Sequence, residues 1–251
     1  MYDDADLAHK AARGRNIALS QRPDAIQRHG RGAPVASIHS IHMRARLRRS
    51  ISSTPTGGVA KRIFDILISS LILALLALPL AIVATLIRLD SAGPVLFVQR
   101  RGGFRGRPFL IYKFRTMKSC DDGPTISQAT IQDNRVTRLG AFLRKTSIDE
   151  LPQLINVLKG DMSLIGPRPH ALAHDEAFAK IDQRYRRRFR ARPGITGLAQ
   201  VSGSRGLTDT DQAVHDRVAF DNAYIRTWSL ALDAQILMRT ALLLLGDKNA
   251  Y

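Results

Sequence analysis

Residues 61–87 read KRIFDILISSLILALLALPLAIVATLI, and this stretch decides how the rest of the chain is interpreted. Its part from Ile66 to Ile87 contains 22 residues, none of which is charged. As a helix this part would be roughly 33 Å long, close to the hydrocarbon thickness of a bilayer. A buried core helix of that length without one polar face would be unusual. The stretch therefore predicts a membrane segment.

Whether this helix spans the bilayer is a separate question. Pro79 lies within it and removes one N–H from the helix ladder. A spanning helix usually has an asymmetry of Lys and Arg between its flanks, but here both flanks are basic. A helix broken at Pro79 that enters and leaves by the same face would satisfy both flanks and make the protein monotopic. An ordinary kinked span is the alternative, because proline is tolerated in transmembrane helices.

The composition limits the classes of partner. The chain has 251 residues, with 38 Lys and Arg against 21 Asp and Glu, so its formal charge is +17. Such a charge predicts nucleic acid, anionic lipid or phosphate-bearing substrates as partners. Apolar residues make up 45% of the chain, which excludes a wholly disordered protein. The single cysteine, Cys120, excludes an internal disulfide framework and a zinc site built from several cysteines.

The chain divides into three parts by composition. Residues 1–58 are basic and have no sustained hydrophobic period, which predicts a mostly disordered segment. Acidic residues near the start argue against a secretory signal. The membrane helix is expected at 59–88, and residues 89–251 are enough for one domain.

Within 89–251 the pattern predicts mainly helices. Two short strands at 95–99 and 109–114, joined by a Gly- and Arg-rich link, indicate a hairpin. Helical spacing is found at 135–145, 151–158, 176–190, 214–228 and 230–245. The fold class that follows is predominantly α with a small β-hairpin.

The segment SIDELPQ, residues 147–153, places Asp149 and Glu150 beside a helix start. A structural interpretation is a capping box, in which Glu150 returns to the backbone of Ser147. However, Pro152 would then lie inside the helix, whereas proline prefers the first helical position. If the helix starts at Pro152, the carboxylates lie just outside it and are available as a nucleophile or as Mg²⁺ ligands.

Several basic groups strengthen the chemical interpretation. They occur at 113–115, 144–145 and 166–169, next to Gly or Pro residues. Arg pairs bidentately with phosphate oxygens, and prolines on both sides of Arg168 would fix its backbone. A pyrophosphate also needs a hard divalent cation, for which Asp161 is a further candidate carboxylate.

A second basic run lies in the predicted helix at 176–190 and just beyond it. Its arginines are expected to lie against anionic lipid headgroups, and a solvated helix face is the alternative. The run comprises Arg184, Arg186, Arg187, Arg188, Arg190 and Arg192.

Five motifs together resemble the bacterial sugar transferase family, whose members are monotopic polyprenyl-phosphate sugar-1-phosphate transferases. The resemblance extends over about residues 60–250, and the closing stretch from 217 to 240 is most similar to members that initiate exopolysaccharide synthesis. The motifs are KRIFDILIS (61–69), GPVLFVQRR (93–101), YKFRTM (112–117), DNRVTRLGAFLRKTSIDELPQLINVLKGDMSLIGPRP (133–169) and RPGITGLAQVSG (192–203).

The resemblance implies a phosphoglycosyl transferase. Such an enzyme transfers hexose-1-phosphate from a UDP-sugar to undecaprenyl phosphate and releases UMP through an aspartyl phosphosugar intermediate. The family's catalytic dyad corresponds to Asp149 and Glu150, which are also the implied Mg²⁺ ligands, with Asp161 as a further candidate. The phosphate- and nucleotide-binding positions correspond to Lys113, Arg115, Arg144 and Arg168.

The resemblance also implies a location. A re-entrant helix would seat the catalytic domain, 89–251, on the cytoplasmic face of the bacterial inner membrane, in contact with phospholipids. The family breaks this helix at a Ser-Pro pair, whereas this chain has Leu78-Pro79 and so lacks one hydroxyl that could satisfy the broken helix. Nucleic acid is not an expected partner, and a homodimer is left open.

Two interpretations from other classes remain. A non-catalytic membrane scaffold for polysaccharide assembly would not need the dyad, which is intact here. A membrane-tethered nucleic-acid-binding protein would show salt-sensitive binding, but the chain has no recognition motif that supports it.

Overall fold

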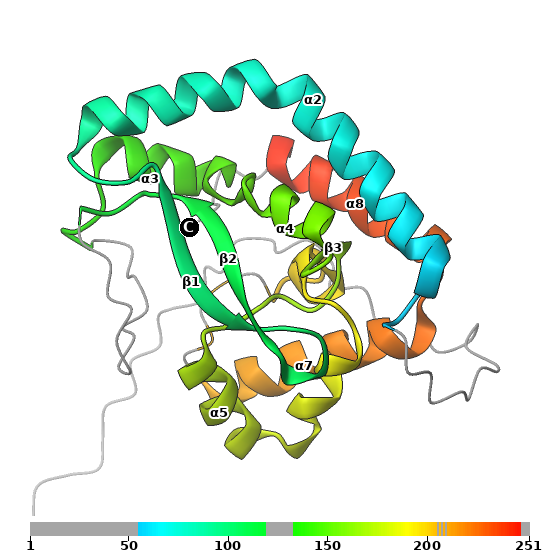
Figure 1. The fold of residues 1–251 in the computed structure, drawn as a ribbon. Coiled ribbons are helices and arrows are strands. Elements are labelled where there is room, and N and C mark those ends of the chain that lie inside the picture. The colour runs from blue at the N-terminus through cyan, green and yellow to red at the C-terminus, as the bar shows by residue number, and fades with distance from the viewer. Residues whose placement is uncertain (1–54, 119–132, 205, 207, 209, 247–251) are drawn as a thin grey trace, which may run out of the picture. The chain divides into compact units, whose positions relative to one another are not determined.

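The computed structural model describes residues 55–118, 133–204, 206, 208 and 210–246, so nearly all of the segment predicted to be disordered at 1–58 lies outside it. Most described elements are helices, and the predicted hairpin is present (Figure 1). The elements are α2 (Gly58–Asp90), β1 (Leu96–Gly102), η1 (Phe104–Gly106), β2 (Pro108–Phe114), α3 (Arg138–Lys145), η2 (Ile148–Glu150), α4 (Gln153–Lys159), β3 (Ser163–Ile165), α5 (Leu172–Ile181), η3 (Gln183–Arg190), β4 (Gly194–Thr196), α6 (Leu198–Val201), α7 (Asp211–Thr227) and α8 (Leu230–Gly246).

Helix α2 has the reverse of the burial pattern found in water-soluble proteins. Its most apolar 18-residue window has a mean hydropathy of 2.8, yet only 6% of that window is buried in the molecule. Three of its four buried residues are polar, namely Lys61, Asp65 and Ser69. Apolar side chains therefore cover its outer surface, and α2 is long and apolar enough to enter a membrane.

Helix α2 is one continuous helix that includes Pro79. Figure 1 shows that the helix nevertheless changes direction along its length. Proline removes a backbone hydrogen bond and crowds the preceding turn, which is a common cause of such a bend. The structure thus has a bent, continuous helix, and its re-entrant course remains a prediction.

The β1–β2 hairpin is longer than the sequence pattern predicted. The two strands pair antiparallel from Leu96 opposite Phe114 to Gly102 opposite Pro108. The turn contains Arg105 at φ 58°, a conformation that non-glycine residues seldom adopt. The hairpin carries Lys113 at the penultimate position of β2, where it contacts Asp149 and Glu150.

A second, parallel pair of strands was not predicted. Ser163 of β3 lies opposite Gly194 of β4, and Ile165 lies opposite Thr196. Strands of three residues are too short to show a hydrophobic period, which explains the omission. The chain is tightly packed beside them: a Cβ on Gly166 would lie 2.4 Å from the carbonyl oxygen of Arg192, so only glycine fits there.

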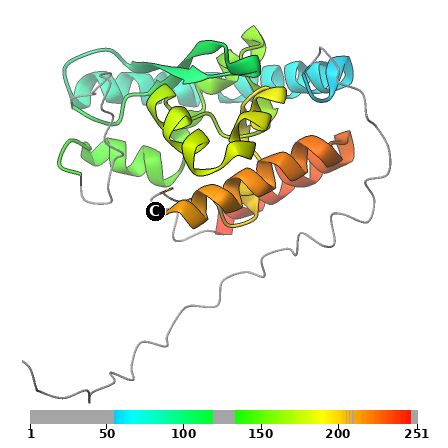
Figure 2. The same cartoon turned by 90° about the horizontal axis from the view of Figure 1, so that it is seen from below.

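The predicted single helix at 176–190 is wrong. Helix α5 ends at Ile181, and the Arg-rich segment that follows is the 3₁₀ helix η3. Asp182 separates the two, because its carboxylate accepts a hydrogen bond of 2.8 Å from the Arg184 amide at the start of η3. Figure 2 shows α5 and η3 between the β1–β2 hairpin and α7, with which they are in contact.

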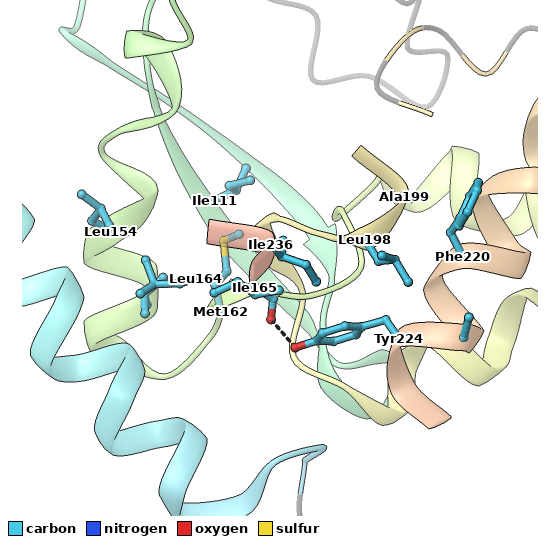
Figure 3. Close-up of a cluster of buried hydrophobic side chains, with 12 residues drawn as sticks. Ile111, Leu154, Met162, Leu164, Ile165, Leu198, Ala199, Phe220, Tyr224 and Ile236 are labelled. Atoms are coloured by element: carbon cyan, nitrogen blue, oxygen red, sulfur yellow. Dashed lines mark hydrogen bonds between the residues drawn. The ribbon is translucent and has the colours of Figure 1, made fainter. Parts of the chain in front are cut away.

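The main hydrophobic cluster joins the hairpin, α4, β3 and the C-terminal helices (Figure 3). The Tyr224 hydroxyl donates to the Ile165 carbonyl over 3.1 Å, so this aromatic residue belongs to the core. The buried members are Ile111, Leu154, Val157, Met162, Leu164, Ile165, Leu198, Ala199, Phe220, Ala223, Tyr224 and Ile236.

Candidate active site

The two candidate catalytic carboxylates lie on one turn of 3₁₀ helix, η2, between α3 and α4. Helix α4 starts directly after Pro152, as expected from the preference of proline for helix starts. The alternative capping box is not formed, because Ser147 makes no side-chain cap bond and Glu150 is directed at two cations. Ser147 has φ 58°, a costly conformation that is common at functional sites.

Glu150 is held by two basic side chains. Arg168 donates to both carboxylate oxygens, from Nη1 at 3.0 Å and from Nη2 at 2.5 Å, and Lys113 Nζ donates at 2.8 Å. Burial alone would raise the pKa of Glu150, but the charges of Arg168 and Lys113 hold it below its usual range. Glu150 is therefore an ionised carboxylate that fixes the positions of both cations.

Asp149 has a different environment although it is the next residue. Its only ion-pair contact within the described part of the chain is with Lys113 Nζ, 4.0 Å from Oδ2. Burial raises the pKa of Asp149 to about 6; Lys113 opposes this rise and the charge of Glu150 adds to it. Two adjacent carboxylates with opposite pKa shifts are typical of sites in which the two groups have different chemical roles.

Lys113 is positioned through Asn156, a residue that sequence reasoning missed. Asn156 is fully buried in α4; its amide donates to the Leu110 carbonyl at 2.6 Å and its side-chain oxygen accepts from the Tyr112 amide at 3.0 Å. These two bonds attach β2 to the helix that follows the dyad. The available signal in the sequence was that Asn156 is one of only two polar residues in the stretch at 151–158.

Arg168 reaches the dyad from the loop after β3. It lies between two prolines, whose rings fix the backbone on both sides. The Pro167 carbonyl accepts a hydrogen bond of 3.0 Å from the amide of Gly194, which attaches the loop to β4. The structure thus brings Lys113, Asp149, Glu150 and Arg168 together from three separate segments.

Arg144 and Arg115 are placed differently. Arg144 Nε donates to Thr116 Oγ1 at 3.0 Å. The charge of Arg144 also opposes the rise in the pKa of Asp149 that burial causes. Arg115 is buried and donates to the carbonyls of Ala92 and Ser91 at 2.7 and 2.6 Å. It therefore stabilises the segment that leaves α2, and a contact of Arg115 with phosphate remains a prediction.

Asp161 lies in the turn after α4, away from the dyad's ion pairs. Its Oδ2 is 3.7 Å from Lys159 Nζ and 3.4 Å from the Asn156 side-chain amide. Across the described ranges no three His, Cys, Asp or Glu side chains gather as a metal site. Among the described residues, a metal ion at the dyad would therefore have two carboxylate ligands and no third His, Cys, Asp or Glu ligand.

This arrangement suits chemistry on phosphate. A buried carboxylate that is ionised near neutral pH is bordered by ammonium and guanidinium groups, which neutralise phosphate oxygens. A carboxylate in such a setting can act as a nucleophile, as it does in aspartyl-phosphate enzymes.

Comparison with known proteins agrees with this chemistry. A UDP-glucose:undecaprenyl-phosphate glucose-1-phosphate transferase of Caulobacter vibrioides is 53% identical over 191 residues, which cover 76% of this chain and 72% of the relative. The Escherichia coli K12 protein of the same description is 47% identical over 79% of this chain, but the match spans only 43% of the relative's length. An exopolysaccharide production protein, PSS, of Rhizobium leguminosarum is 45% identical over 72% of this chain and 93% of the relative.

The family-level comparison covers most of the molecule. The model of the bacterial sugar transferase family matches residues 56–247, which include α2, the hairpin, the dyad and the C-terminal helices. Because this match extends over more than half of the chain, the protein belongs to the bacterial sugar transferase family.

Proposed function

We propose that the protein transfers glucose-1-phosphate from UDP-glucose to undecaprenyl phosphate, as the first step of exopolysaccharide assembly. The observation that carries the proposal is the buried Asp149 carboxylate beside cations held by Glu150. The donor and acceptor are taken from the descriptions of the Caulobacter and Escherichia relatives. The basic site, the net charge of +17 and the apolar surface of α2 all suit an anionic nucleotide and an anionic lipid.

The reaction is proposed in two displacements. Asp149 attacks the β-phosphorus of UDP-glucose, a new P–O bond forms, and the bond to the bridging oxygen breaks. UMP leaves with that electron pair. A phosphate oxygen of undecaprenyl phosphate then attacks the same phosphorus and displaces Asp149, giving undecaprenyl-diphosphate glucose. The carboxylate is regenerated, so the atoms and charges of both steps balance.

Glu150 would position the two cations, Lys113 and Arg168, and these cations would neutralise phosphate charge. Glu150 holds both cations beside the nucleophile before substrate arrives. The diphosphate of the donor brings new anionic oxygens to the same cations. Preorganised cations near the reacting phosphorus stabilise the charge that develops in phosphoryl transfer, which is the largest contribution expected from such a site.

Magnesium is proposed as the cofactor, and the donor set restricts how it could bind. Mg²⁺ is commonly held by one or two carboxylates together with substrate phosphates. Each carboxylate oxygen has two lone pairs, so Asp149 and Glu150 retain acceptor capacity beside their cation contacts. The residues therefore fit a Mg²⁺ ion that is shared with the diphosphate. When bound it would neutralise phosphate charge.

We also propose that α2 enters the inner membrane from the cytoplasmic side and returns to it. This is supported by the bend of α2, its apolar surface and the basic residues at both of its ends. Single cysteines introduced at Thr56 and Ala92, with Cys120 replaced by serine, should both be labelled from the cytoplasmic side. Labelling of one from each side would show a spanning helix.

The test of the function is UMP release by the full chain in detergent or nanodiscs, with undecaprenyl phosphate, Mg²⁺ and a panel of UDP-hexoses. UDP-glucose is expected to give UMP. Release with a different UDP-hexose only would overturn the sugar assignment. Failure of every sugar with folded, lipid-bound protein would favour the scaffold alternative.

The pH dependence of the first displacement should report the state of Asp149. Because the pKa of Asp149 is raised to about 6, its carboxylate is protonated and unreactive at lower pH. Without acceptor, the rate of the UMP burst should be constant above about pH 7 and fall about tenfold per unit below about pH 6. Omitting the acceptor removes the titration of its own phosphate. A profile that stays flat down to pH 5 would contradict the assignment of Asp149.

A further inference from the structure

A buried polar cluster lies directly behind Arg168 and is not used by the mechanism above. We call it the Arg168 support cluster. It consists of polar and charged side chains from the start of α5, from η3 and from α7. Its members are His170, Asp175, Tyr185, Arg188, Arg217 and Asp221.

Arg188 is the centre of this cluster. It is 4% exposed, and its Nη2 donates to the backbone carbonyl of Arg168. Its Nη1 is 2.6 Å from both the Tyr185 hydroxyl and His170 Nδ1. Asp221 Oδ2, 3.0 Å from Nη2, supplies the opposite charge. A buried guanidinium with these partners has little freedom, because each lost contact leaves a desolvated polar group.

The other members hold Arg188 in place. The Tyr185 hydroxyl, which accepts from Arg188, donates in turn to Asp175 Oδ1, and the Arg188 guanidinium lies 4.8 Å from the centre of the Tyr185 ring. His170 has guanidinium groups at both ring nitrogens, with Arg217 Nη1 at 3.2 Å from Nε2. Burial lowers the pKa of His170 well below its usual value, so a neutral ring is available to accept from an arginine.

The Arg168 backbone is thereby restrained from several directions. Proline rings precede and follow it, and the Pro167 carbonyl is bonded to the amide of Gly194. The carbonyl of Arg168 itself is bonded to Arg188. On the other side, the Arg168 side chain makes its two-pronged contact with Glu150. Restraint of the backbone therefore sets where the guanidinium stands beside the dyad.

We propose that Arg188 is a positioning residue for the transfer reaction: through the Arg168 carbonyl it holds the Arg168 guanidinium in register with Glu150. This inference rests on the proposed function, because its effect on kcat can be measured only if the protein catalyses the transfer. It assigns to one arginine of the basic run a role inside the protein, although the sequence pattern placed the whole run at lipid headgroups or in solvent.

The test is a double-mutant cycle with the full chain. The Arg188→Lys variant keeps a cation beside Asp221 but cannot contact Arg168, Tyr185 and His170 at once. It should lower kcat about 30-fold, because a misplacement of about 1 Å can cost about 100-fold. In an Arg168→Gln background, Arg188→Lys should cost less than about twofold, since the group that it positions is gone. Arg187→Lys, an exposed neighbour in η3, is the matched control and should retain full activity.

Equal losses from Arg188→Lys in both backgrounds would overturn the proposal, because a general structural defect does not depend on Arg168. Full activity of Arg188→Lys would overturn it as well. If Arg188→Lys does not fold, Tyr185→Phe removes only the hydroxyl and should give a loss of about fivefold with the same dependence on Arg168. A parent protein without UMP release would instead contradict the proposed function.

A second readout needs no substrate. Amide hydrogen exchange in residues 163–172 should become faster in Arg188→Lys and stay unchanged in Arg187→Lys. Unchanged exchange in both variants would show that Arg188 does not restrain the Arg168 loop. This measurement decides the positioning role even when the parent protein shows no transfer activity.

Discussion

Replacing Asp149 by asparagine is expected to lower the rate of UMP release by more than about 1,000-fold, because the amide has almost the same shape but cannot attack phosphorus. The loss should be present with and without undecaprenyl phosphate, since the first displacement itself is blocked. Initial rates of UMP formation measure it. Asp216→Asn, an exposed position in α7, is the matched control and should leave the rate unchanged.

The same variant should separate lost chemistry from lost folding. The pKa of Asp149 lies above the ordinary value of 3.8, which means that the folded protein disfavours the ionised form. Above about pH 6 the native carboxylate therefore lowers stability, and Asp149→Asn removes that charge. Its midpoint of thermal unfolding at pH 8 should not fall below that of the parent. A variant that is both folded and fully active would exclude Asp149 as the nucleophile.

The sequence was sufficient to find the dyad but not to choose between its two interpretations. A capping box is a local pattern, and Ser147 and Glu150 match it. In the structure Glu150 instead contacts Lys113 and Arg168, which are 37 and 18 residues away in the chain. Contacts over such separations depend on the packing of β2 and of the loop after β3, and a single sequence does not show that packing.

The arginine run was harder to interpret for a related reason. A cluster of like charges predicts an exposed face, and Arg186, Arg187 and Arg190 are indeed exposed. In η3 the buried residues are Tyr185 and Arg188, which are three residues apart and so lie on one face of the helix. An α-helix would also place these two residues on one face, but a run of like charges does not show which face meets the core.

A second large effect is expected on stability, at the junction between α2 and α8. Asp233 is an acidic residue in the first turn of the largely apolar helix α8. In the structure it is fully buried, with Lys61 Nζ at 2.7 Å. The Tyr224 hydroxyl shares its single proton between the Ile165 carbonyl and the other Asp233 oxygen, which is 2.7 Å away, and Trp228 Nε1 donates to Asp233 at 3.0 Å. Asp233 thus ties the start of α2 to two C-terminal helices.

Replacing Asp233 by leucine should therefore lower the free energy of unfolding by about 3–5 kcal/mol, because buried Lys61 would lose its closest counter-ion and, among the described residues, keep only its 4.0 Å contact with Asp65. Thermal unfolding in detergent, followed by circular dichroism, measures the change, and Asp216→Asn again serves as the control. The double variant Lys61→Met and Asp233→Leu should recover only part of the loss, because it removes the buried charge of Lys61 but also takes the cation away from buried Asp65. A double variant that recovers none of the stability lost in Asp233→Leu would contradict the expected contribution of the Lys61 charge.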